Sequence, residues 1–388
     1  MEDLPTELIE NIVGWVEFPD VCALRLTGRN ISLKSSTNAT CQRFYSSKRL
    51  DITQACLEQL VQFTQTGQIG HWLQRLTLHD CAAREPPPSN AADLLSQALA
   101  NLCDRPGQLS ILLRIDRFEK FEESREIASR LFHLTLSALE KSKLPIMALD
   151  IFKEGYMHLH GLHCSLAFSD IGNALTRHDR AALVTSFQSC RKLCLSLGHS
   201  TIGFDLDRVV RLRLPLELPM TYDGARHNTQ SLCDLLSLCP NLEELQLLWE
   251  YEEFDETNAS EEELHFFNRV GATCSFASLK RCSLRGIRTK ETSIMAFFRR
   301  LPQLTELILE NISCETGTFD GLLLLVSTTM PELDRLWLRC LHDESGSLEF
   351  QDEPAHSVWK GRPGSPQRGI RRSGSDARRL VVPSNRRG

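Results

Sequence analysis

One short apolar pattern recurs along most of this 388-residue chain and limits the folds open to it. The pattern is Leu-x-x-Leu-x-Leu, and its last two leucines lie two residues apart, as in a β-strand with one buried face. Clear copies begin at Leu73, Leu242, Leu279, Leu304 and Leu333. Weaker copies begin at Ser110, Ile146, Cys190 and Val209. Such repetition predicts many similar strands that lie side by side.

Segments with helical periodicity separate these strands. Their apolar residues recur at i, i+3 and i+4, which places them on one face of a helix. The segments are 90–103, 124–141, 228–238, 291–301 and 318–329. One strand and one helix cannot bury both of their apolar faces, whereas stacked pairs can. We therefore predict an α/β solenoid with parallel strands along one side and helices along the other.

The strand pattern also resembles a known repeat. The run from Leu73 to Cys81 reads Leu-x-x-Leu-x-Leu-x-x-Cys, which is typical of a leucine-rich repeat. Only this copy has the Asn or Cys expected three residues after its last leucine, and the units vary from roughly twenty to forty-five residues. Residues 53–345 are thus expected to form an irregular leucine-rich-repeat-like region.

The first fifty residues follow a different pattern. Pro5 suits the first turn of a helix, because its missing N–H is not needed there. Phe18-Pro19-Asp20 then breaks the helix, and we expect Asp20 to cap a second, short helix. The first helix carries apolar residues at helical spacing, namely Leu4, Leu8, Ile9, Ile12, Val13 and Val16. By periodicity alone, a small helical subdomain that packs on the rest of the chain explains this stretch equally well.

The order of residues in this stretch resembles the F-box. Leu-Pro-x-Glu-Leu-x-x-x-Ile comes first, then a break, then Asp-Val-x-x-Leu-Arg-Leu, and finally Phe44. The F-box is a three-helix module that docks on the Skp adaptor of SCF-type ubiquitin ligases. The resemblance covers residues 1–50 and is closest to fungal proteins in which a leucine-rich-repeat-like region follows the F-box. The resemblance implies that six residues contact the adaptor or pack in the core of the module, and which residues do which stays open. These six are Leu4, Pro5, Leu8, Ile12, Leu24 and Leu26.

Charge is distributed unevenly along the chain. The formal net charge is −6, yet residues 360–388 hold Lys360 and eight arginines against one acid, Asp376. That segment lacks an apolar period, and we predict that residues 350–388 form a disordered basic tail. A second biased stretch, 250–263, holds eight acids and no base. We interpret it as a solvated insertion, with recognition of a basic partner as the alternative.

Other features narrow the class of protein. The fourteen cysteines lie mostly in apolar runs, which favours buried, reduced thiols. No stretch of eighteen consecutive apolar residues occurs, so a membrane is not expected as a partner. Nucleic acid is not expected as a partner either. The histidines in 158–163 crowd one short stretch without a second pair of ligands, so we favour a solvated loop over a zinc site.

These observations lead to one functional expectation. No nucleophile elbow or phosphate-binding glycine loop is present, so we expect neither an enzyme nor a cofactor. The resemblance implies a substrate-recognition subunit that binds the Skp-type adaptor, and through it cullin, and that holds an unknown target protein on its repeats. The alternatives are an F-box scaffold outside ubiquitination and a helical-plus-repeat protein without adaptor contact. The target, and the choice between cytoplasm and nucleus, stay open.

Overall fold

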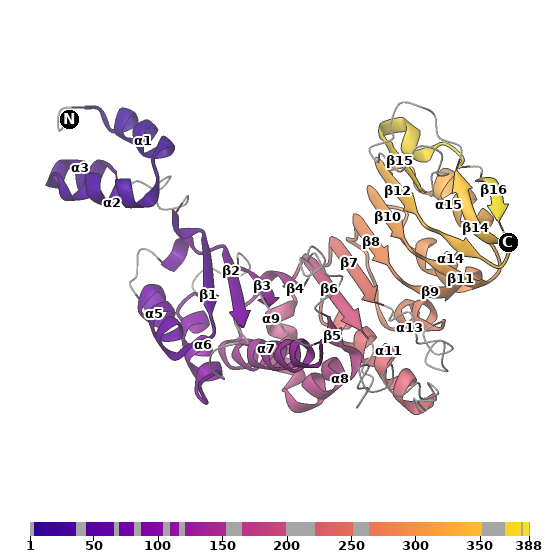
Figure 1. Ribbon diagram of the computed structural model, residues 1–388, viewed down its shortest axis with the longest axis horizontal. Coiled ribbons are helices and arrows are strands. Elements are labelled where there is room, and N and C mark those ends of the chain that lie inside the picture. Colours follow the sequence, from indigo (N-terminus) through magenta and orange to yellow (C-terminus); the bar gives the residue numbers. More distant parts are fainter. Residues whose placement is uncertain are drawn as a thin grey trace, which may run out of the picture.

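Three short helices open the chain and lie apart from the rest of it, near the β1 edge of a large sheet (Figure 1). The computed structural model describes residues 4–35, 44–65, 70–80, 87–103, 109–115, 121–152, 165–198, 222–250, 264–350, 369–381 and 383–387. The three helices, which we call the helical unit, are α1 (Thr6–Trp15), α2 (Phe18–Leu26) and α3 (Arg29–Lys34).

The helical unit has a small core of its own. Ile9, Val13 and Val21 are buried against one another. Lys34 Nζ at the end of α3 donates a hydrogen bond of 2.7 Å to the Leu4 carbonyl and so ties the end of the unit to its beginning. The prediction that Asp20 caps the second helix is wrong. The helix begins at Phe18, because Pro19 is well suited to its first turn, and Asp20 lies within that turn.

A mostly parallel sheet of 11 strands, the main sheet, forms the centre of the molecule. The predicted α/β class is therefore confirmed at the level of a mixed fold with a large parallel sheet. The strands follow the order β1-β2-β3-β4-β6-β7-β8-β10-β12-β15, and β5 pairs with β6. Their bounds are β1 (Ser47–Asp51), β2 (Arg75–Asp80), β3 (Leu109–Ile115), β4 (Ile146–Ile151), β5 (Leu166–Ala167), β6 (Lys192–Gly198), β7 (Glu244–Glu250), β8 (Arg281–Arg285), β10 (Glu306–Glu310), β12 (Arg335–Arg339) and β15 (Gly369–Ser373).

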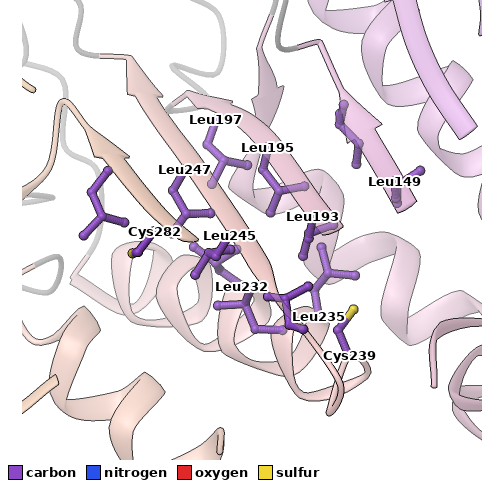
Figure 2. Packing of buried hydrophobic residues seen from close by; sticks show 14 of the residues in the cluster. Leu149, Leu193, Leu195, Leu197, Leu232, Leu235, Cys239, Leu245, Leu247 and Cys282 are labelled. Atoms are coloured by element: carbon purple, nitrogen blue, oxygen red, sulfur yellow. The ribbon is translucent and has the colours of Figure 1, made fainter. Parts of the chain in front are cut away.

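The predicted leucines stack in register across this sheet. Leu245 of β7 pairs with Cys282 of β8, which pairs with Leu307 of β10 and then Leu336 of β12. All four are buried, since alternate residues of a strand share one face. Figure 2 shows leucines of β6 and β7 meeting Leu232 and Leu235 of a neighbouring helix. The Val209 copy lies outside the described residues.

Helices cover the buried face of the main sheet, as the sequence pattern predicts. The predicted ones are α6 (Ala91–Ala100), α7 (Phe121–Ser142), α11 (Tyr222–Ser237), α14 (Glu291–Phe298) and α15 (Asp320–Thr329), and α5 (Gln54–Gln65) follows β1. No predicted segment covers α8 (Phe168–Arg177), α9 (Arg180–Phe187), α13 (Phe266–Thr273) or the short 3₁₀ helix η1 (Gly70–Trp72).

A tight turn follows three neighbouring strands and starts a second, smaller sheet. The residues after β8, β10 and β12 are Gly286, Asn311 and Cys340, and all three have a positive φ of 50–67°. The chain then turns into short parallel strands, β9 (Arg288–Lys290), β11 (Ser313–Thr316) and β13 (His342–Asp343). β14 (Gly346–Phe350) and β16 (Pro383–Arg387) extend this sheet in antiparallel fashion. The next position of each turn is a buried apolar residue, Ile287, Ile312 or Leu341, where a leucine-rich repeat usually has Asn or Cys.

The prediction of disorder across 350–388 is wrong for Phe350, which ends β14, and for residues 369–381 and 383–387. β15 pairs antiparallel with β12, and the 3₁₀ helix η3 (Gly374–Arg378) follows it. Ile370, Ala377 and Val381 are buried in the main core. The open edge of β12 offers backbone N–H and C=O groups that hydrogen-bond to this segment. Because these bonds form, a few buried side chains suffice to order it.

Candidate functional site

The helical unit exposes an unusual amount of apolar surface. On α1, Leu8, Ile12 and Trp15 lie on one stripe and are 48%, 38% and 88% exposed. Leu26 at the end of α2 is 88% exposed, and Leu33 on α3 is 73% exposed. Elsewhere in the described part of the chain, the exposed large apolar side chains are only Met147, Val184, Leu324 and Leu380. Apolar surface gathered in so small a unit marks an interaction site.

The structure divides the six predicted adaptor residues into two groups. Leu4 and Leu24 are partly buried and pack on Ile9, Val13 and Val21, so they belong to the core of the unit. Pro5, Leu8, Ile12 and Leu26 are exposed. Trp15 and Leu33 belong with the exposed group, although neither is among the six predicted residues. The i+7 spacing of Leu8 and Trp15 was the available signal for Trp15.

A second candidate surface lies on the side of the main sheet away from the helices, which we call the strand face. Its side chains alternate with the buried leucines. Along β6, β7, β8, β10 and β12, one row across the sheet alternates in charge, namely Lys192, Glu244, Arg281, Glu306 and Arg335. Glu244 lies 2.6 Å from Lys192 Nζ and 2.7 Å from Arg281 Nη2. Such cross-strand pairs of opposite charge also favour this strand order.

The pKa values of this row follow from its contacts. Partial burial alone would raise the pKa of Glu244, but the hydrogen bonds from Lys192 and Arg281 outweigh burial and hold it below its ordinary value. Burial would likewise lower the pKa of Lys192, yet its bond to Glu244 raises that pKa. Both groups are thus charged at neutral pH.

A second charged row lies near the carboxyl ends of β8, β10 and β12. Glu310 of β10 lies 2.8 Å from Arg339 Nη1 on β12 and 3.9 Å from Arg285 Nη1 on β8. Burial lowers the pKa of Arg285, which Glu310 partly offsets. Between the two charged rows runs a row of uncharged side chains that ends with Ile308 and Trp337, and the Arg371 guanidinium lies 5.3 Å from the centre of the Trp337 ring.

The first charged row and the uncharged row beside it line a shallow depression of about 350 Å³. Its lining includes Lys192, Glu244, Gln246, Arg281, Glu306 and Arg335. Glu244 is buried there, but the cations are partly exposed, with Arg281 at 46% and Arg335 at 67% of the side chain. This part of the strand face is thus open to a macromolecular partner.

The strand face is different near the other end of the sheet. Arg114 of β3 is buried and lies 2.9 Å from Asp150 of β4. Asp80 at the end of β2 lies on the helix side instead, where it accepts from the partly exposed Arg130 of α7 at 2.9 Å. A buried pair such as Arg114 and Asp150 fixes neighbouring strands but is not presented to a partner.

Several predicted features lie partly or wholly outside the described residues. The histidine stretch 158–163 is one of them, and only Glu250 of the acidic stretch 250–263 falls inside, at the end of β7. The described residues contain no group of His, Cys, Asp and Glu able to hold a metal ion. Seven of the described cysteines are buried free thiols, in agreement with the prediction of buried, reduced cysteines. Across the described helices, none is long and apolar enough to cross a membrane.

Comparison with known proteins adds no identity. No protein-family model matches the sequence, and no curated protein matches it. The two surfaces described above are therefore the basis for assigning a function.

Proposed function

We propose that this protein is a substrate-recognition subunit of an SCF-type E3 ubiquitin ligase. Its helical unit is an F-box that docks on the Skp-type adaptor, and its main sheet is an irregular leucine-rich-repeat-like solenoid that holds the target protein. The observation that carries the proposal is the exposed apolar stripe on α1, Leu8, Ile12 and Trp15, within a segment whose residue order resembles the F-box.

The separation of buried from exposed apolar residues within the helical unit supports adaptor docking. Ile9 and Val13 face inward, so the unit does not need Leu8 or Ile12 for its own core. Burying two large apolar side chains at an interface contributes about 2 kcal/mol each. Their exposure therefore has a cost unless a partner covers them.

The proposed protein performs no bond chemistry. It joins a target to a ligase assembly, and the gain is a higher effective concentration of the target near the ubiquitin-carrying enzyme. Among the described residues, two separate surfaces argue for this role. One is apolar, the other is charged, and they belong to two parts of the chain with separately packed cores.

The test is a pull-down with a purified Skp-type adaptor. We expect Leu8→Asp and Ile12→Asp to reduce adaptor binding by at least about a hundredfold, because each places a charge in an apolar interface. Leu324→Asp and Val184→Asp are the matched controls, since these side chains are 53% and 41% exposed on other helices. Adaptor binding that is absent in the wild type, or equal in all four variants, contradicts the F-box assignment.

A second measurement separates a ligase subunit from a scaffold. A ligase subunit brings cullin with it when it is recovered through the adaptor, and turnover of its bound target depends on cullin neddylation. Recovery of the adaptor without cullin supports the F-box scaffold outside ubiquitination.

A further inference from the structure

The strand face of β6 to β15 carries more positive than negative charge. By strand register, the anions of this face are Glu244, Glu250, Glu306 and Glu310. The cations are Lys192, Arg281, Arg285, Arg335, Arg339 and Arg371. Glu244, Glu306 and Glu310 each lie between two cations in the strand register, and the six cations exceed the four anions by two. The whole chain, in contrast, has a net charge of −6.

The basic excess comes from two separate parts of the chain. Arg371 belongs to β15, which reaches this face only because it pairs with β12. Its guanidinium lies over Trp337, so the segment adds both a cation and a cover for one side of an aromatic ring. The antiparallel strand thereby extends the charged surface beyond the last parallel strand.

The same face offers apolar contact between the charged rows. Ile308 and Trp337 are partly exposed there, and the depression of about 350 Å³ lies across β6 to β12. A ligand that fits this face carries negative charge opposite the cations of each charged row. It also carries at least one apolar group opposite Ile308 and Trp337, which lie between the rows. An acidic peptide with an aromatic or aliphatic side chain meets this description.

We propose that this basic strand face, Lys192, Arg281, Arg285, Arg335, Arg339 and Arg371 around Ile308 and Trp337, binds an acidic segment of the target protein. The identity of the ligand as a ligase target rests on the proposed function, whereas the binding itself rests on the charges of the face. A peptide is favoured over nucleic acid because the whole chain is acidic and would repel a long polyanion.

Fluorescence anisotropy with the full chain provides the test. The probe is a short labelled peptide of glutamates on either side of one phenylalanine, and a lysine peptide of the same length is its control. We expect the glutamate peptide to bind at low ionic strength and to weaken as salt is added, because the contacts are partly exposed charges. Failure to bind, or equal binding of the lysine peptide, overturns the proposal.

Substitutions of opposite sign make the test sharper. Arg281→Gln together with Arg335→Gln should weaken peptide binding about tenfold or more, whereas Glu306→Gln should strengthen it. The control pair is Lys141→Gln with Arg299→Gln, which removes the same charge from the helix side, and thermal unfolding checks that each variant is folded. Equal weakening by the control pair, or tighter binding of a single-stranded oligonucleotide of equal charge, overturns the assignment to a peptide.

The outcome is independent of the adaptor test. Leu8→Asp and Ile12→Asp are expected to leave peptide affinity unchanged, because they lie on the helical unit and not on the strand face. Loss of peptide binding with intact adaptor binding disproves only this inference. Peptide binding without adaptor binding disproves the proposed function and leaves a basic peptide-binding face.

Discussion

The helical unit and the main sheet differ in how much of their apolar side-chain surface they bury. The helical unit buries the four apolar side chains of Ile9, Val13, Val21 and Ile31 and leaves five large apolar side chains exposed. The main sheet buries a continuous leucine-rich core between its strands and helices, and the part of its outer face from β6 to β12 is rich in charge. One surface is apolar and the other is polar.

This difference predicts two kinds of contact. An apolar contact depends on burial of area and is hardly affected by salt. A contact between exposed charges is screened by salt and contributes mainly to specificity and to the rate of association. The molecule therefore combines a surface suited to lasting attachment with one suited to selecting a partner.

The largest effect is expected from the turn after β8. Gly286 has φ of +67°, and an added Cβ would lie 1.9 Å from the backbone carbonyl oxygen of Trp249. We expect Gly286→Ala to reduce the free energy of unfolding of the main sheet by about 3 kcal/mol or more, because the strained φ and the backbone clash add. Thermal or urea unfolding measures this loss.

Gly374→Ala is the matched control for that change. Gly374 also has a positive φ, of +61°, but nothing lies within 4 Å of the added Cβ. Its cost should be about 1 kcal/mol, the strain alone. Equal costs at both positions would show that Trp249 moves aside. Adaptor binding should survive Gly286→Ala, since the helical unit has its own core.

A smaller effect is expected in the helical unit. Ile9→Ala truncates one of the four buried apolar side chains there and should cost about 2 kcal/mol of local stability. Hydrogen exchange should then accelerate across residues 4–35 while the main sheet keeps its protection. Leu324→Ala, on an exposed position, should change neither region. Joint acceleration of both regions would contradict the separation of the two cores.

The sequence predicted the parts of the main sheet whose pattern is local. Leu245, Leu307 and Leu336 each open a strand with period two, and the stacked register follows from that period. Even the weakest predicted copy, at Ser110, lies in a strand, β3. Helices with a clear apolar stripe, such as α7, were equally predictable.

Parts that depend on distant partners were not predictable in the same way. β15 has only one apolar residue in its buried positions, Ile370, and its pairing depends on the edge of β12. The short strands β9, β11 and β13 depend on the left-handed turns before them. Gly286 and Asn311 were the available signals for those turns, since Gly and Asn tolerate positive φ.

The charged row was present in the sequence but not recognised. Glu244, Arg281 and Glu306 each stand directly before the first buried residue of a strand, so alignment of the strand copies would have revealed the alternation. Which of Leu4, Leu8 and Leu24 face inward was not decidable, because it depends on how α1, α2 and α3 cross, and periodicity does not specify that crossing.

The smallest expected effect concerns Glu244 and acid. Its folded-state pKa is lowered, so the stability it contributes is present above the unfolded pKa, about 4.3, and is lost as the pH falls through the folded pKa. Glu244→Gln should therefore cost about 1 kcal/mol at pH 6, and the difference from wild type should shrink toward pH 3. Urea unfolding at each pH measures it. In a chain that carries Lys192→Gln and Arg281→Gln, this pH dependence should reverse its sign, because burial then raises the pKa of Glu244 and no cation offsets it. A difference that stays constant with pH would show that the row is held by packing and that its charges matter only to a partner.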